Sequence, residues 1–77
     1  MLQAYVLIET EMGKARDVTT MVSGIDGVTS VAAVNGPYDV IAVTEAANVD
    51  ELGSVTVARI QAVEGIIRTL TCPVVQL

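Results

Sequence analysis

A five-residue segment, Asn35–Asp39 (NGPYD), holds residue types that suit the binding of a small zwitterion. Gly36 has no side chain, so a ligand can approach the backbone closely there. Tyr38 offers an aromatic wall, and the Asp39 carboxylate could neutralise the ammonium group of a free amino acid. Backbone N–H groups of a tight turn could hold the carboxylate of the same ligand. Alternatively, Gly36 and Pro37 only shape a turn and Asp39 only caps it.

A second polar patch lies near the C-terminus, within an otherwise apolar run. Thr69 and Thr71 are two residues apart, so on a strand both hydroxyl groups project from the same face. These hydroxyl groups could bind a carboxylate or amide group of a ligand. The competing interpretation is that threonine is simply a good strand residue.

Residues for catalysis or metal binding are scarce. The chain has no histidine and one cysteine, and we find no Ser–Lys pair, Cys–His pair or phosphate-binding glycine loop. Acidic side chains such as Glu9, Glu11, Glu45 and Glu51 stand at the ends of predicted elements, where solvated charges are ordinary. The cysteine, Cys72, lies in an apolar run and is predicted to be buried in a strand. We therefore predict a protein that is not an enzyme and has no catalytic residue, metal or cofactor.

The length and charge of the chain limit the number of domains and the kinds of partner that it can bind. The 77 residues suffice for one domain, residues 1–77. Nine acidic residues against four scattered basic ones give a net charge of −5, which argues against direct nucleic-acid binding because phosphate neutralisation needs a basic patch. No stretch approaches the roughly 20 apolar residues of a membrane span. The N-terminus lacks the basic segment and cleavage site of a signal peptide, so we expect a cytoplasmic protein.

The periodicity of apolar residues predicts the elements that position these side chains. Apolar runs bounded by Gly, Asn and Pro predict four strands: Leu2–Thr10, Val28–Val34, Asp39–Glu45 and Ile66–Val75. Pro73 places the end of the last strand at a sheet edge or beyond regular pairing. Helical spacing predicts one helix over Lys14–Ser23 and a second from an Asn48 cap to about Ala62. The inner side of that second helix is predicted to hold Val49, Leu52, Thr56, Ile60 and Val63.

The element order βαββαβ predicts the α+β class. A faint repeat supports this order, because Ile25–Val28 (IDGV) matches Val63–Ile66 (VEGI). Two right-handed βαβ units give a ferredoxin-like arrangement, a four-stranded antiparallel sheet with both helices on one face.

The other face of that sheet is predicted to be uncovered and yet apolar. On two strands both alternating sets of side chains are mostly apolar. Leu2, Ala4, Val6 and Ile8 alternate with Tyr5 and Leu7 on the first strand, and Val40 and Ala42 alternate with Ile41 and Val43 on the third. Packing two such sheets face to face would remove this surface from water. We therefore expect dimerisation to be part of folding.

The order of the motifs resembles the effector-binding domain of the Lrp/AsnC family of feast-or-famine regulators. It is carried by Gly27-Val28-x-x-Val31-x-x-Val34-x-Gly36-x-Tyr38-Asp39, followed by Ile60-Gln61-x-x-Glu64-Gly65-Ile66-x-x-Thr69-x-Thr71. The resemblance implies that the domain dimerises through its sheets and that dimers assemble into rings, typically octamers. It also implies that free amino acids bind in clefts between dimers.

Carried over residue by residue, the resemblance implies a set of ligand-binding residues: Gly36, Tyr38, Asp39, Thr69, Thr71, Ala33 and Asn35. Ala33 and Asn35 would line the cleft from a neighbouring subunit. Full-length regulators carry an N-terminal helix-turn-helix, whereas this sequence begins at the first strand of the effector domain. It is therefore similar to short members of the family, whose action on transcription would be indirect. Mixed oligomers with full-length Lrp/AsnC regulators are one hypothesis for that action.

Three alternatives remain open. A purely structural or hetero-oligomerising module would use the hairpin only to shape an interface. A dimeric α+β barrel enzyme shares the fold, but it would need an acid or base between its sheets, and the lack of histidine argues against it. An ACT-type domain also binds amino acids between subunits. Its glycine-bearing loop follows the first strand, where this chain has Gly13.

Overall fold

Four strands form a single antiparallel sheet in the order β2-β3-β1-β4. The computed structural model describes all residues, 1–77. The strands are β1 Leu2–Thr10, β2 Val28–Ala33, β3 Val40–Ala46 and β4 Ile66–Pro73. Strand β1 pairs with both β3 and β4, so β2 and β4 are the edge strands. Pro73 lies at the end of an edge strand, as predicted, because proline has no N–H group to donate to a ladder.

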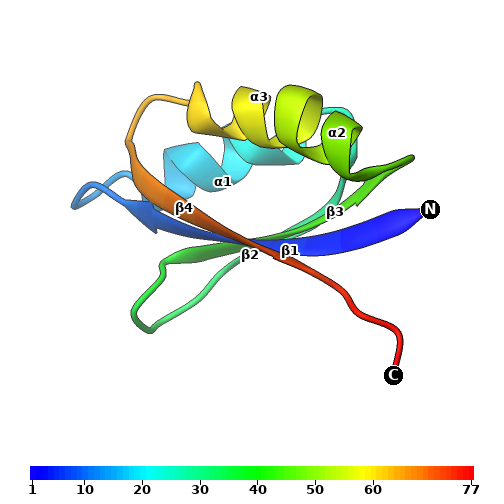
Figure 1. Ribbon diagram of the computed structural model, residues 1–77. Coiled ribbons are helices and arrows are strands. Elements are labelled where there is room, and N and C mark those ends of the chain that lie inside the picture. Colours follow the sequence, from blue (N-terminus) through cyan, green and yellow to red (C-terminus); the bar gives the residue numbers. More distant parts are fainter.

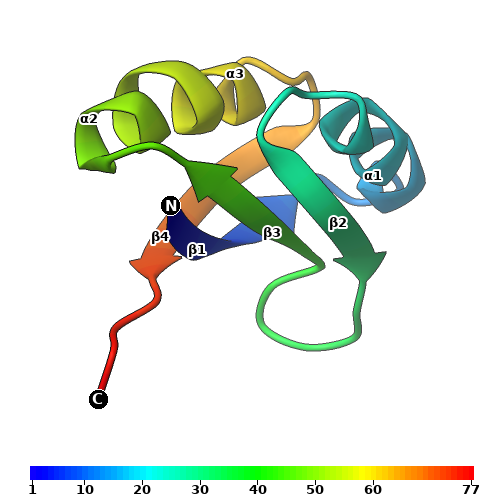
Figure 2. The ribbon, with the colours of Figure 1, turned by 90° about the vertical axis from the view of Figure 1, so that its right-hand side faces the viewer.

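Two helical segments cover one face of the sheet (Figure 1). The first is α1, Ala15–Ser23, and it packs over β2 and β3. The second consists of α2 Val49–Glu51, the π-helical stretch η1 Leu52–Val57 and α3 Ala58–Gln61, and its end lies beside β4. Figure 2 shows the two segments side by side above the sheet. The predicted βαββαβ order and the ferredoxin-like α+β fold are confirmed.

The second helical segment buries residues spaced four apart: Leu52, Thr56 and Ile60. In a regular α-helix such a stripe drifts around the axis, because one turn takes 3.6 residues. The wider π turns, with i→i+5 hydrogen bonds, compensate for this drift. The Asn48 cap is confirmed, since its side chain accepts a 2.8 Å hydrogen bond from Glu51 N–H. The placement of Val49 on the inner side was wrong, because Val49 is 65% exposed in the first turn.

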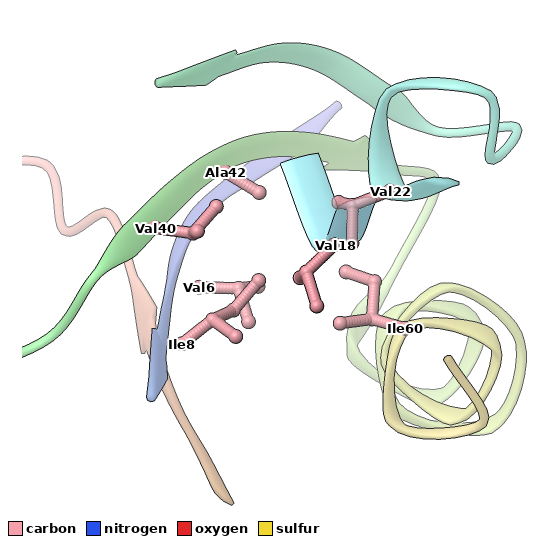
Figure 3. Close-up of a cluster of buried hydrophobic side chains, with 7 residues drawn as sticks. All are labelled: Val6, Ile8, Val18, Val22, Val40, Ala42 and Ile60. Atoms are coloured by element: carbon pink, nitrogen blue, oxygen red, sulfur yellow. The ribbon is translucent and has the colours of Figure 1, made fainter. Parts of the chain in front are cut away.

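The hydrophobic core lies between the sheet and the helices. Figure 3 shows side chains from β1, β3, α1 and α3 pointing toward one another: Val6, Ile8, Val18, Val22, Val40, Ala42 and Ile60. All seven are fully buried. The Thr44 side chain is also buried, and its hydroxyl group donates to the Ala4 carbonyl at 3.0 Å. This bond satisfies the buried polar atom inside the apolar layer.

The two glycines of the internal repeat make equivalent turns from a helix into a strand. Gly27 precedes β2 with φ +94°, and Gly65 precedes β4 with φ +99°. Residues other than glycine rarely adopt this left-handed backbone conformation. At Gly65 a Cβ would also lie 3.1 Å from the Cβ of Lys14, so the turn packs tightly against the start of α1. The faint sequence repeat therefore corresponds to a repeated structural turn.

The connection between β2 and β3 is wider than predicted. Val34 and Asp39 lie outside the strands, so residues 34–39 form a six-residue loop in place of a tight turn. A backbone hydrogen bond from Val34 N–H to the Asp39 carbonyl, 2.8 Å long, closes the loop at its base. The proline after Gly36 helps to explain the widening, because it fixes its own φ and restricts the residue before it.

The sheet face turned away from the helices has no cover in the chain (Figure 1). We call it the open face and define it by its apolar residues: Tyr5, Leu7, Ala32, Ile41, Val43, Leu70 and Cys72. Tyr5 and Leu70 are each 47% exposed. The 34–39 loop and the C-terminal residues project on this side of the sheet, near opposite ends (Figure 1). An apolar sheet face of this kind is typical of an interaction surface.

Cys72 was predicted to be buried, and within the chain that prediction is wrong. Cys72 is exposed, because it stands on edge strand β4 opposite Tyr5, with its side chain on the open face. Its apolar neighbours in sequence therefore do not indicate burial inside one chain.

Neither helical segment has the length and apolarity that a membrane crossing requires.

Candidate functional site

The 34–39 loop offers hydrogen-bond donors that the chain itself does not use. The N–H groups of Asn35, Gly36 and Tyr38 have no acceptor within the chain, whereas Asp39 N–H donates to the Ile8 carbonyl at 2.9 Å. The fold of the chain does not require a glycine at position 36. The backbone there is not left-handed, and no heavy atom lies within 4 Å of where a Cβ atom would stand. The loop is thus anchored at its base and open along its backbone.

The Asp39 carboxylate joins the loop to the end of β1. Its Oδ2 atom accepts hydrogen bonds from Thr10 N–H at 2.9 Å and from the Thr10 hydroxyl group at 3.2 Å. Asp39 is partly exposed. The alternative that Asp39 caps its own turn was wrong, because its side chain caps a backbone donor of the neighbouring strand β1 instead. The Oδ1 atom has no partner within the chain and is available to an ammonium group.

Tyr38 contacts a cation that sequence analysis missed. The Cζ atom of Arg68 lies 5.8 Å from the centre of the Tyr38 ring, within the range of a cation–π interaction. The Nε atom of Arg68 also pairs with Glu9 Oε1 at 2.6 Å. Glu9 and Arg68 are opposite each other in the β1–β4 register. Only that register could have identified the pair, because the two residues are far apart in sequence.

A depression of about 420 Å³ lies between the β1–α1 connection and the 34–39 loop. Its lining includes the carboxylates of Glu9, Glu11 and Asp39 and no basic side chain. Since Glu9 is paired with Arg68, the net negative charge comes from Glu11 and Asp39, and it attracts a cationic group. The side chains are not arranged to hold a metal ion, since no group of three or more His, Cys, Asp or Glu residues has suitable geometry. The depression therefore suits the ammonium end of a zwitterion.

A second depression, of about 430 Å³, lies beside α1 and the connection into β4. It is lined by Lys14, Asp17, Thr20, Met21 and Glu64. None of the residues predicted to bind a ligand lines it.

Thr69 and Thr71 lie on the opposite face of the sheet from the open face. They pair with Ile8 and Val6 of β1, whose side chains are buried beneath the helices. The Thr69 hydroxyl oxygen accepts a 2.9 Å hydrogen bond from Gln61 Nε2, at the end of α3. The predicted placement of both hydroxyl groups on one face is confirmed.

One chain does not bring all predicted site residues together. Strand β1 separates β4, with Thr69 and Thr71, from β3 and the 34–39 loop. No hydrogen bond links either threonine to the loop. Ala33 is exposed at the end of β2, and Asn35 is exposed in the loop. A site containing all of these residues would need a second chain.

Comparison with known proteins identifies the family. Residues 3–76 match the family model described as the Lrp/AsnC ligand binding domain. No protein of curated function matches the chain.

Solved structures with the same fold include TTHA0845 from Thermus thermophilus, with a TM-score of 0.91 and 30% identity over 100% of this chain and 96% of that one. FFRP-DM1 has a TM-score of 0.89 and 27% identity, over 97% of this chain and 100% of that one. A feast or famine regulatory protein from M. tuberculosis, complexed with L-methionine, has a TM-score of 0.81 and 22% identity. The match covers all of this chain but 52% of that one. By the match to the family model over residues 3–76, the chain belongs to the Lrp/AsnC ligand-binding domain family.

Proposed function

We propose that the chain is a non-catalytic sensor domain that binds a free amino acid. The observation that carries the proposal is the 34–39 loop. In a chain of the Lrp/AsnC ligand-binding family, it presents three backbone N–H groups without an acceptor beside an Asp39 oxygen without a donor. These are the two kinds of partner that a zwitterion needs, because its carboxylate accepts and its ammonium group donates.

Each end of the ligand has a proposed partner. Asp39 Oδ1, in the acidic depression, takes the ammonium group, and Gly36 allows the ligand to lie close to the backbone N–H groups. The ring of Tyr38, supported by Arg68, forms one wall. A distant structural relative is complexed with L-methionine, which supports an amino acid as the class of ligand.

The proposal includes a homodimer that packs open face against open face. The charged residues Glu9 and Arg68 pair with each other near the end of the sheet, so the centre of the face is left to apolar side chains. A second copy supplies a matching apolar surface, since a twofold interface joins the same patch on both subunits. Further assembly of dimers, with an octamer as the expected form, would bring Thr69 and Thr71 of one subunit toward the loop of another. Ala33 and Asn35 would then border the cleft.

An effect on transcription would be indirect, through mixed oligomers with full-length Lrp/AsnC regulators. The family model describes a ligand binding domain, and one structural relative is a feast or famine regulatory protein; both favour a binding protein over an enzyme. The cytoplasmic location stays a prediction from the sequence.

Thermal unfolding against each of the twenty amino acids at millimolar concentration tests the proposal. A ligand present at 100 times its Kd stabilises the native state by about 2.7 kcal/mol. We expect a shift that is confined to one or a few amino acids. A confirmed oligomer that shows no shift with any of the twenty would instead support a purely structural or hetero-oligomerising module, the alternative that the exposed apolar face also favours.

Asp39→Asn makes the test specific to the ammonium contact. The amide oxygen can still accept from Thr10, while the unpartnered carboxylate oxygen is replaced by an NH₂ group that repels an ammonium group. We expect a folded protein with no ligand-induced shift. Asp17→Asn removes the same charge at an exposed position of α1, outside the acidic depression, and should keep the shift.

A further inference from the structure

Six of the eight threonines make a hydrogen bond within the chain through the hydroxyl group, and they do so in two different ways. Five of them donate the hydroxyl proton to a carbonyl or carboxylate oxygen: Thr10, Thr19, Thr20, Thr29 and Thr44. Thr69 instead accepts, from Gln61 Nε2 at 2.9 Å, and its own proton has no acceptor within the chain. A hydroxyl group has one proton to donate and two lone pairs. The contact with Gln61 therefore leaves Thr69 with a free donor.

Packing of the neighbouring residue Ile60 anchors the helix backbone next to Gln61. Ile60, its neighbour on α3, is fully buried in the core. Gln61 itself is exposed, and Thr69 is partly exposed on the edge strand β4. The hydroxyl proton is therefore reachable from solvent, while the helix backbone that carries the Gln61 amide is held in place. The hydrogen bond from Gln61 Nε2 occupies one lone pair of the Thr69 oxygen.

We propose that Gln61 is a positioning residue that turns the Thr69 hydroxyl group into a dedicated donor for the carboxylate of the bound amino acid. This inference rests on the proposed amino-acid-binding function and adds a residue and a selection rule to it. With one lone pair occupied by Gln61, Thr69 favours a ligand group that accepts a hydrogen bond. A carboxylate accepts more strongly than a neutral amide, because the hydrogen bond is charge-assisted.

Two substitutions separate this role from simple support of the fold. In Gln61→Glu the side chain can only accept, so the Thr69 proton turns toward it and the Thr69 oxygen faces the ligand as an acceptor. In Gln61→Met the side chain keeps a similar length but makes no hydrogen bond, so the Thr69 hydroxyl group rotates freely. The first variant changes the Thr69 hydroxyl group from a donor to an acceptor toward the ligand. The second variant only removes the hydrogen bond that orients this hydroxyl group.

The experiment measures Kd by titration calorimetry for L-methionine and for L-methioninamide at pH 6, where the ammonium group of the amide is charged. If another amino acid stabilises the wild type more, its free acid and primary amide replace this pair. We expect the wild type to prefer the acid, and Gln61→Glu to lower the acid-to-amide preference by roughly tenfold or more. Gln61→Met should weaken acid binding by roughly three- to tenfold and keep the preference for the acid.

Thr69→Val is the background that isolates the contact. In that background Gln61→Glu should leave the acid-to-amide preference nearly unchanged, because no hydroxyl group remains to be turned. An unchanged preference in Gln61→Glu alone would overturn the inference and leave the sensor proposal intact. A Gln61→Glu effect equally large in the Thr69→Val background would also overturn it, because it would be a general charge effect. A wild type that binds none of the twenty amino acids would overturn both proposals.

Discussion

Leu7→Thr tests the proposed dimer at the middle of the open face. Leu7 stands on β1 with Ile41 directly opposite on β3 and Leu70 directly opposite on β4. Threonine has the β-branched shape that strands favour and removes most of the apolar side chain. The strand should therefore persist in the variant while the contact surface is lost.

The size of the effect follows from the burial that remains to be gained. Full burial of a leucine side chain stabilises by about 1.5–3 kcal/mol, and Leu7 is already half-buried within the chain. A dimer would supply the rest, and a twofold interface contains Leu7 twice. Because Leu7 has less than half of its surface left to bury and threonine keeps a methyl group, we expect Leu7→Thr to weaken the dimer by about 1–2 kcal/mol, or roughly 5- to 30-fold in Kd.

Sedimentation velocity over a dilution series measures this change directly. Met21→Gln is the matched control, because Met21 is 61% exposed on α1, in the helical layer away from the open face. The control should sediment like the wild type at every concentration. Two results would refute the reasoning: a wild type that is monomeric throughout the series, or a Leu7→Thr variant whose dissociation curve matches that of the wild type.

Three further predictions concern stability and reactivity. Gly65→Ala should lower the free energy of unfolding by at least about 1 kcal/mol, because φ is +99° and a Cβ atom would be crowded there. Urea unfolding measures this loss, and the control variant Gly36→Ala should unfold like the wild type. Asp39→Ala should cost about 1–3 kcal/mol in the same assay, because the capped donor on β1 loses its partner; a loss equally large in Asp39→Asn would count against the cap. The Cys72 thiol is exposed on the open face of one chain. It should react with a thiol reagent much more slowly in the wild-type dimer than in Leu7→Thr. Equal rates would contradict the burial of Cys72 at the interface.

The order of elements could be predicted from the sequence because its signals are local. Apolar alternation, helical spacing and the turn glycines each depend on residues within a few positions of one another. The IDGV and VEGI segments predicted a doubled βαβ unit, and the structure has the same left-handed glycine turn in both. The apolar character of both sets of side chains on β1 and β3 likewise predicted the open face before any pairing was known.

The polar contacts of the site could not be predicted, because they join residues that are distant in sequence. The pairing of Glu9 with Arg68 depends on the β1–β4 register, and a shift of one residue would send the side chains to the other face. In the same way, the reach of Asp39 to Thr10 depends on where the 34–39 loop leaves the sheet.

Edge position and helix geometry were also decided by the tertiary structure. Cys72 lies in an apolar run that predicts burial, yet edge strand β4 places it on a face that nothing in the chain covers. The Gln61 contact arises because α3 ends beside β4, on the side where Thr69 projects. The sequence by itself determined the number, order and approximate extent of the strands and helices, since local periodicity is enough for that. Which side chains meet at the loop and along β4 was decided only by the sheet order, the strand register and the packing of the helices.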